Sequence, residues 1–188
     1  MTRKVPVLAT LLVLAAVATM IALGFWQLGR KGEKEALIAR YESAIALSSE
    51  APWPTTEAEV ESSLYRVATL TCARVLEQRT TAGRSTAGAA GLAHTARCAL
   101  ADGGEASVVI GWSPDPREIA WQGGTVTGVV APGPRLVAMS PAPGLQPIAR
   151  PDPRDLPNNH LAYAGQWFLF ALTALVIYVL ALRRRWRS

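Results

Sequence analysis

The chain has 188 residues, half of them hydrophobic, with a mean hydropathy of +0.19 and a formal net charge of +5. This composition indicates a membrane protein with one modest folded domain and argues against a purely soluble one. Residues 31–157 carry 12 Lys and Arg against 14 Asp and Glu, so the basic excess lies at the chain ends. Basic groups beside apolar segments are typical of membrane orientation, so we expect no nucleic-acid partner.

The first apolar segment, residues 5–26, carries no charge. As a helix it would extend about 33 Å, which is enough to cross the hydrocarbon core of a bilayer. A cleaved signal peptide is the alternative, with Arg3 and Lys4 as its basic region and residues 16–18 as its cleavage site. Apolar residues continue well past that site, which favours an uncleaved transmembrane helix, assigned to residues 5–28.

A second uncharged segment predicts a second transmembrane helix at residues 159–182, followed by a basic tail at residues 183–188. Aromatic residues lie near both of its borders, as expected for interfacial anchoring. Membrane lipid is therefore a partner of the chain. The intervening residues, 29–158, are predicted to form one exported α+β domain.

The basic flanks set the expected orientation. Arg3, Lys4 and the four C-terminal arginines favour cytoplasmic termini, whereas Arg30, Lys31 and Lys34 oppose this. Long connecting domains cross largely regardless of their charge, so we give the termini precedence. We expect a two-pass protein of a bacterial inner (plasma) membrane, with both termini cytoplasmic and the central domain periplasmic.

The only two cysteines, Cys72 and Cys98, both fall in the central domain. An oxidising compartment would permit a structural disulfide between them, and buried free thiols are the alternative. A loop of this length would stabilise the fold by roughly 3 kcal/mol in the chain-entropy model. A metal site is not expected, because no set of ligands with metal-like spacing surrounds the two cysteines.

The central domain begins with an apolar stripe at helical spacing in residues 31–47. The acidic stretch 55–63 predicts a short solvated helix or a loop, and the glycine-rich stretch 81–91 predicts a flexible loop. Eight prolines in residues 131–157 predict an irregular return to the membrane. Strands are predicted at residues 64–75, 92–100, 106–112, 124–130 and 135–140. Short strands with Gly and Pro turns predict a small antiparallel β-sheet or a partly closed barrel.

Signs of catalysis are lacking in the sequence. It contains neither a phosphate-binding glycine loop nor a nucleophile elbow. Residues 92, 94, 96, 98 and 100 would share one face of a strand, with His94 a partly exposed strand histidine. We therefore expect a protein that is not an enzyme.

The start of the second apolar helix is unusually polar. His160, Tyr163, Ala164 and Trp167 stand at i, i+3, i+4 and i+7 and would share one helical face. Asn158 or Asn159 would serve as the N-cap. Interfacial anchoring explains the tyrosine and the tryptophan, but it explains His160 less well.

A second polar cluster lies at the end of the first apolar helix. Trp26 and Arg30 are one turn apart, and Gln27 lies between them. If the two helices pair, this cluster and the one at His160 would meet at the outer membrane surface.

Both clusters resemble the signatures of a known family. "GFWQLGRKGEK" at residues 24–34 resembles the Gly-x-Trp-Gln-x-x-Arg-x-x-x-Lys signature of the Surf1/Shy1 family. "NNHLAYAGQWF" at residues 158–168 resembles its Asn-x-His-x-x-Tyr-Ala-x-x-Trp-Phe signature. The order of the two motifs and their positions at the membrane also agree with that family.

The resemblance implies an assembly factor for haem–copper cytochrome c oxidase that helps to deliver or insert haem a into the catalytic subunit. Subunit 1 and other haem-delivery factors would be its partners, and haem a would be held transiently. His160 matches the family's candidate haem ligand, as neutral imidazole is a common axial ligand of haem iron. Arg30 is hypothesised to pair with a haem propionate. Trp26, Gln27, Tyr163 and Trp167 complete the candidate cofactor-binding set.

Two other functions are open at this point. One is a membrane scaffold without a cofactor, whose paired helices dock on an oxidase subunit. The other is a thiol-redox protein using Cys72 and Cys98, although the chain has no Cys-x-x-Cys motif to supply a reactive cysteine.

Overall fold

A computed structural model describes residues 6–47 and 49–187. Contacts divide the chain into two compact units. One holds the chain up to Leu37 together with the part from Pro157 onward, and the other holds Ile38–Leu156. Each unit is described by itself. Val5, the first residue of the predicted membrane segment, and its basic flank of Arg3 and Lys4 lie outside the described residues.

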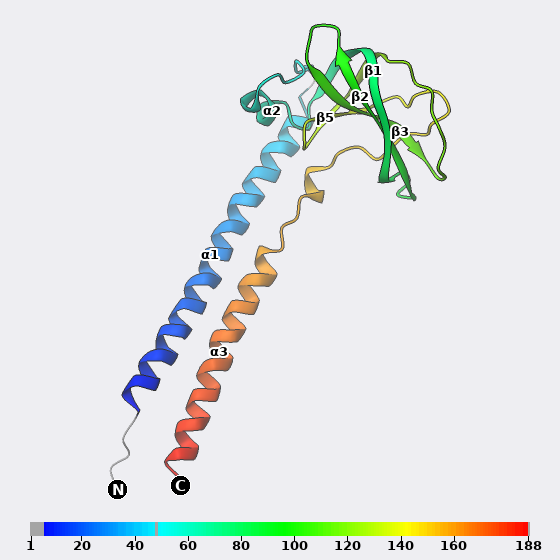
Figure 1. Cartoon of the computed structure of the whole chain (residues 1–188). Helices are drawn as coiled ribbons and strands as arrows, with labels where there is room; N and C mark the ends of the chain where they lie inside the picture. Colours follow the sequence, from blue (N-terminus) through cyan, green and yellow to red (C-terminus); the bar gives the residue numbers. More distant parts are fainter. Residues whose placement is uncertain (1–5, 48, 188) are drawn as a thin grey trace. The chain divides into compact units, whose positions relative to one another are not determined.

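The first unit contains most of α1 (Val7–Ile45) and all of α3 (His160–Arg185), drawn in Figure 1 in blue and in orange to red. Both helices are long and apolar enough to cross a membrane, and large apolar side chains are exposed along both. The predicted pair of apolar helices is confirmed. At 39 residues, α1 extends about 58 Å, well beyond a hydrocarbon core of about 30 Å. The helix predicted from residue 31 is therefore the continuation of the first apolar helix.

The second unit contains a five-stranded barrel (Figure 1). Its strands are β1 (Val67–Arg84), β2 (Ala90–Leu100), β3 (Glu105–Ser113), β4 (Gly124–Ala131) and β5 (Arg135–Ala138). Pairings follow the order β1-β2-β3-β5-β4, and β4 pairs back with β1. The predicted sheet or barrel is confirmed. The strand pairs are antiparallel except for β3 and β5, which pair in parallel. A five-stranded Greek-key barrel of this kind is the architecture of the OB-fold.

The long strand β1 explains how so few strands make a barrel. Its first part, Val67 to Cys72, pairs with β4, and its later part, from Cys72 to Arg84, pairs with β2. Two register shifts in the β1–β2 pairing interrupt the strand where it changes partner. Such bulges bend a strand and increase its twist, which lets one strand belong to two sides of a barrel.

Both faces of the sheet are buried in places. The most buried side chains include Ala68, Ala96, Val108, Val130 and Leu136, one from each strand. Alternation along a strand puts a second cluster on the opposite face: Ala93, Val109, Ala131 and Val137, with Ile148 packed against it.

Ile148 belongs to the return segment, residues 139–159, which carries only the short 3-10 helix η1 (Pro153–Asp155). Its irregular course agrees with the proline-rich pattern. Residues 93–96 of β2 are all buried, so both faces of the strand are covered over this stretch.

The polar stretch before β1 forms the short helix α2 (Glu57–Ser63). Thr56 and Glu59 make a capping box, in which each side chain accepts a hydrogen bond from the other's backbone N–H. Hydrogen bonds from Thr55 and Thr56 lower the pKa of the Glu59 carboxyl. A local cap thus decides between the two alternatives, helix or loop, for this stretch.

The stretch 81–91 is not a flexible loop. Strand β1 continues to Arg84, and β2 begins at Ala90. A Cβ on Gly83 would lie 2.7 Å from the Ala93 side chain, and one on Gly91 would lie 2.5 Å from Trp112. Gly83 and Gly91 thus allow strands and side chains to approach closely, whereas Gly88, with a φ of +82°, lies in the turn between β1 and β2 and donates its N–H to the carbonyl oxygen of Ser85.

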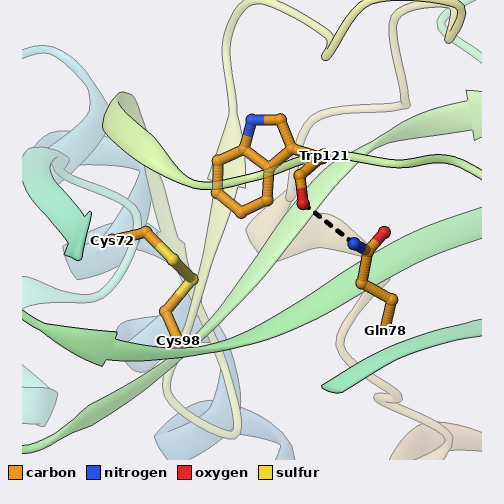
Figure 2. The surroundings of a disulfide bond; sticks show 4 residues. All are labelled: Cys72, Gln78, Cys98 and Trp121. Atoms are coloured by element: carbon orange, nitrogen blue, oxygen red, sulfur yellow. Dashed lines mark hydrogen bonds between the residues drawn. A yellow bond between two sulfur atoms is a disulfide. The ribbon is translucent and has the colours of Figure 1, made fainter. Parts of the chain in front are cut away.

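A disulfide joins Cys72 on β1 to Cys98 on β2 (Figure 2). The predicted pairing is confirmed, and the alternative of free thiols is excluded. Nearby, the Gln78 side chain donates a hydrogen bond of 2.9 Å to the carbonyl oxygen of Trp121 (Figure 2). Cys72 is 2 % exposed and Cys98 is fully buried. Such burial suits a structural cross-link and argues against thiol exchange, which needs access to a sulfur.

Candidate functional site

The two helices of the first unit approach closely at a glycine. A Cβ added to Gly24 would lie 2.5 Å from the Phe168 ring, so the ring occupies the space above the glycine. Phe168 also packs edge-on against Phe25, with ring centroids 5.4 Å apart. Thr10 of α1 hydrogen-bonds to Tyr178 of α3 near the other end of the pair. The contacts run antiparallel along the helices.

Small side chains form the rest of this contact. Ala164 and Ala171 are the buried residues of α3, and Val17 is buried on α1. Thr10, Val17 and Gly24 repeat every seven residues, a spacing that keeps them on one side of a helix in a pair. Small residues at such a face let two membrane helices approach closely.

Gln27 and His160 meet three residues beyond Gly24. The Oε1 atom of Gln27 lies 2.7 Å from Nδ1 of His160. An amide oxygen can only accept a hydrogen bond, so Nδ1 carries a proton and donates it. In the neutral ring, Nε2 then keeps a lone pair. This nitrogen makes no hydrogen bond with any described residue. The pair therefore holds His160 in the tautomer that can bind a metal through Nε2.

Only part of the predicted face of α3 lies against α1. His160 reaches α1 and Ala164 is buried, but Tyr163 is 50 % exposed, and Trp167 packs on Phe170 with ring centroids 6.2 Å apart. The contact side follows His160, Ala164 and Phe168, at intervals of four residues. The large Phe168 ring fits there because Gly24 opposite it has no side chain.

The other two candidates on α1 point elsewhere. Trp26 is 57 % exposed. Arg30 forms an exposed ion pair with Glu33, one turn further along the helix. Of the six predicted cofactor-binding residues, the structure brings together Gln27 and His160.

Asn158 lies beside the N-cap position of α3. Asn159 occupies that position, and its side chain makes no capping hydrogen bond. The Oδ1 atom of Asn158 is buried and accepts no hydrogen bond from the described residues. A buried acceptor without a donor costs about 1–3 kcal/mol.

His94 of the barrel is 4 % exposed, so the prediction of a partly exposed histidine is wrong. Ser113 donates its hydroxyl proton to the carbonyl oxygen of Asp115, at 2.7 Å. Its oxygen must then accept from Nε2–H of His94, at 2.8 Å. A serine activated as a nucleophile needs the opposite arrangement, with the histidine as acceptor. Burial, followed by the nearby Arg117, lowers the pKa of His94.

Metal ligation by the protein alone finds no support among the described residues, where no group of three or more His, Cys, Asp or Glu side chains could hold an ion.

Comparison with known proteins adds an independent result. The model of the SURF1 family matches residues 14–147, which include Gly24, Gln27 and the whole barrel but end before His160. A comparison with curated proteins finds no match. Since the matched residues make up well over half of the chain, the protein belongs to the SURF1 family, which is associated with cytochrome oxidase assembly.

Proposed function

We propose that the chain assists the assembly of haem–copper cytochrome c oxidase by holding haem a transiently at the α1–α3 pair and passing it to subunit 1. Membership of the SURF1 family supports the general role in oxidase assembly. The hydrogen bond between Gln27 and His160 supports the haem-binding step. It fixes the proton on Nδ1 and leaves Nε2 free, which is the form of histidine that ligates iron.

The surroundings of His160 fit an amphipathic cargo. Apolar and aromatic side chains are exposed on both helices and could cover a porphyrin face. A single protein ligand gives a modest affinity, which suits a protein that must release what it binds. Haem a supplies the iron in this proposal, and the chain supplies the ligand, its orientation and the apolar surface.

Arg30 is the proposed partner of a haem propionate. Its present partner is Glu33, and exposed ion pairs of this kind contribute at most about 1 kcal/mol. A propionate could therefore displace Glu33 at little cost. Unchanged haem affinity in an Arg30→Ala variant would remove Arg30 from the site.

The proposed location is a bacterial inner membrane, with both termini cytoplasmic and the barrel periplasmic. Other haem-delivery factors and subunit 1 are the proposed partners. No catalysis is proposed, and the buried hydrogen-bonded arrangement of His94 and Ser113 supports a structural role for both.

The test is to produce the chain together with the enzymes that make haem a, purify it in detergent and record its absorption spectrum. We expect bound haem in the wild type, loss of it in His160→Ala and normal binding in Gln166→Leu, a change at an exposed position of α3. Circular dichroism of each variant checks that the helices are retained. Equal haem content in wild type and His160→Ala would refute His160 as the ligand.

If neither the wild type nor His160→Ala holds haem, the second candidate function remains. It is a scaffold that docks on an oxidase subunit through its paired helices. The unsatisfied Oδ1 of Asn158 favours it, because a partner protein could supply the missing donor. Co-purification of subunit 1 with the wild type but not with Asn158→Leu would support that reading.

A further inference from the structure

The barrel unit contains a cavity of about 600 Å³ that the proposed function does not use. The return segment, from Ile148 to Leu156, lines one side of it, and strands of the barrel line the other. Small-molecule sites usually measure about 300–1,000 Å³, so the size suits an organic ligand and greatly exceeds that of a simple ion.

Four arginines line this cavity: Arg79, Arg84, Arg135 and Arg150. Arg84 donates a hydrogen bond to the carbonyl oxygen of Gly88. The other three make no hydrogen bond or ion pair with any residue that the structure describes. They come from β1, β5 and the return segment, so positive charge reaches the cavity from several sides.

The acidic residues of the cavity do not balance this charge. Asp152 already accepts hydrogen bonds from Nε and Nη2 of Arg154 at 2.6–3.1 Å, and the Arg154 backbone N–H adds another. Asp155 is the remaining acidic group of the lining. The cavity therefore keeps an excess of positive charge that an anion could neutralise.

The cavity also has an apolar floor. This floor is the second cluster of the barrel, formed by Ala93, Val109, Ala131 and Val137, against which Ile148 packs. All five also line the cavity. The cluster itself is largely buried, and the part that faces the cavity, together with Ile148, could contact an apolar body but would gain nothing from a bare anion.

Tyr65 adds a strained residue to the same cavity. Its φ is +63°, in the left-handed region that a bulky side chain rarely adopts, and it is 3 % exposed. Its backbone N–H donates a hydrogen bond to the carbonyl oxygen of Val130, and its ring centroid lies 4.9 Å from that of Tyr41. These two contacts hold the conformation. Burial, and then Asp152, raise the pKa of its hydroxyl, so the group remains a hydrogen-bond donor. Such strain clusters at binding sites.

We propose that this cavity binds an amphiphilic oxyanion: a phosphate or carboxylate held by Arg79, Arg135 and Arg150, with a short apolar body against Val109, Val137 and Ile148. Guanidinium groups match the geometry of both oxyanions through paired N–H donors. The site belongs to the barrel and is independent of His160.

The test uses the full chain in nanodiscs of neutral phosphatidylcholine and three probes: hexyl phosphate, inorganic phosphate and hexanol. Isothermal titration should give the tightest binding for hexyl phosphate, because it alone offers both the charge and the apolar body. Equal affinity for inorganic phosphate would refute a role for the apolar floor. Equal affinity for hexanol would refute the role of the arginines.

The variant Arg135→Gln/Arg150→Gln should weaken hexyl phosphate binding about tenfold or more, since each charge-assisted hydrogen bond contributes substantially. Arg74→Gln is the control, because Arg74 is exposed on β1 and does not line the cavity. An equal loss in Arg74→Gln, or no loss in the double variant, would overturn the proposal. Unchanged haem binding by the double variant is expected, which separates this site from the one at His160.

Discussion

At the scale of single residues, one proton decides what His160 can do. Gln27 accepts a hydrogen bond from Nδ1, so the proton cannot move to Nε2 without breaking that bond. An outer partner of this kind orients a ligating histidine and raises its basicity, and its loss typically costs 10–100-fold in metal affinity. Gln27 is thus a positioning residue, whereas His160 is the proposed ligand.

Replacing Gln27 by Leu should release this constraint. We expect His160 to populate both tautomers and haem affinity to fall by about tenfold. The ¹⁵N chemical shifts of the two ring nitrogens report the tautomer directly, without haem. Gln166→Leu should leave them unchanged, and an unaltered ¹⁵N spectrum in Gln27→Leu would contradict the assigned hydrogen bond.

His94 should make the barrel sensitive to mild acid. Its folded-state pKa lies below the ordinary value of 6.5. The unfolded chain therefore binds the proton more readily, and stability is lost as the pH falls below about 6.5 towards the folded pKa. Urea unfolding of the wild type should show a lower free energy of unfolding at pH 5.5 than at pH 7.5.

The matched variant is His94→Gln, whose amide can still donate to Ser113 but does not titrate. Its stability should change less between pH 7.5 and pH 5.5. The carboxyls of Glu59 and Asp152 also have lowered pKa values, but they titrate well below this window. Identical pH profiles for the two proteins would remove His94 as the cause.

At the scale of elements, the close contact of α1 and α3 depends on Gly24. Valine at this position would clash with the Phe168 ring, which lies 2.5 Å from the position of the added Cβ. We expect Gly24→Val to separate the helices, to lower the thermal stability of the pair in detergent and to free His160 from Gln27. The His160 ¹⁵N spectrum and a thermal melt measure these effects.

Gly29→Val is the control on the same helix, since a Cβ at Gly29 would meet nothing within 4 Å. Both variants carry the same cost in helix propensity, so a difference between them reports the helix contact alone. Equal melting temperatures would show that the contact contributes little.

Sequence patterns predict most elements, because strand alternation and apolar length are local properties. The wrong predictions have non-local causes. Stretch 81–91 has the composition of a loop, but Gly83 and Gly91 lie in strands, where a Cβ would clash with Ala93 of β2 and Trp112 of β3. Ile148, some 50 residues away in the chain, packs against the cluster that includes Ala93, and one strand's pattern contains no sign of that cover.

The candidate site shows the same limit. The motifs name Gln27 and His160, but no spacing within one helix predicts that they touch, because they lie 133 residues apart. Helical periodicity groups His160 with Tyr163, Ala164 and Trp167. Which residues face α1 depends on the other helix, where Gly24 leaves room for the Phe168 ring.

At the scale of the whole molecule, the distribution of basic residues should set the orientation. Replacing Arg183, Arg184, Arg185 and Arg187 by Gln removes the C-terminal excess of positive charge, while Arg30, Lys31 and Lys34 remain. We expect a measurable fraction of chains to place the C-terminus outside, where a fused green fluorescent protein does not fluoresce. Replacement by Lys keeps the charge and should restore fluorescence, because lysine and arginine act alike in this respect.

The divided partnership of β1 has a consequence for the order in which the protein folds. Its later part pairs with β2 across a short turn. Its first part can pair only once β4 has been synthesised, since Thr69 pairs with Thr127. Until then β1 presents an open edge that could pair with another chain. The disulfide needs only β1 and β2, so it can form first and hold this hairpin during synthesis. A chain truncated before residue 124 should therefore already contain the Cys72–Cys98 bond and aggregate more readily than the full chain.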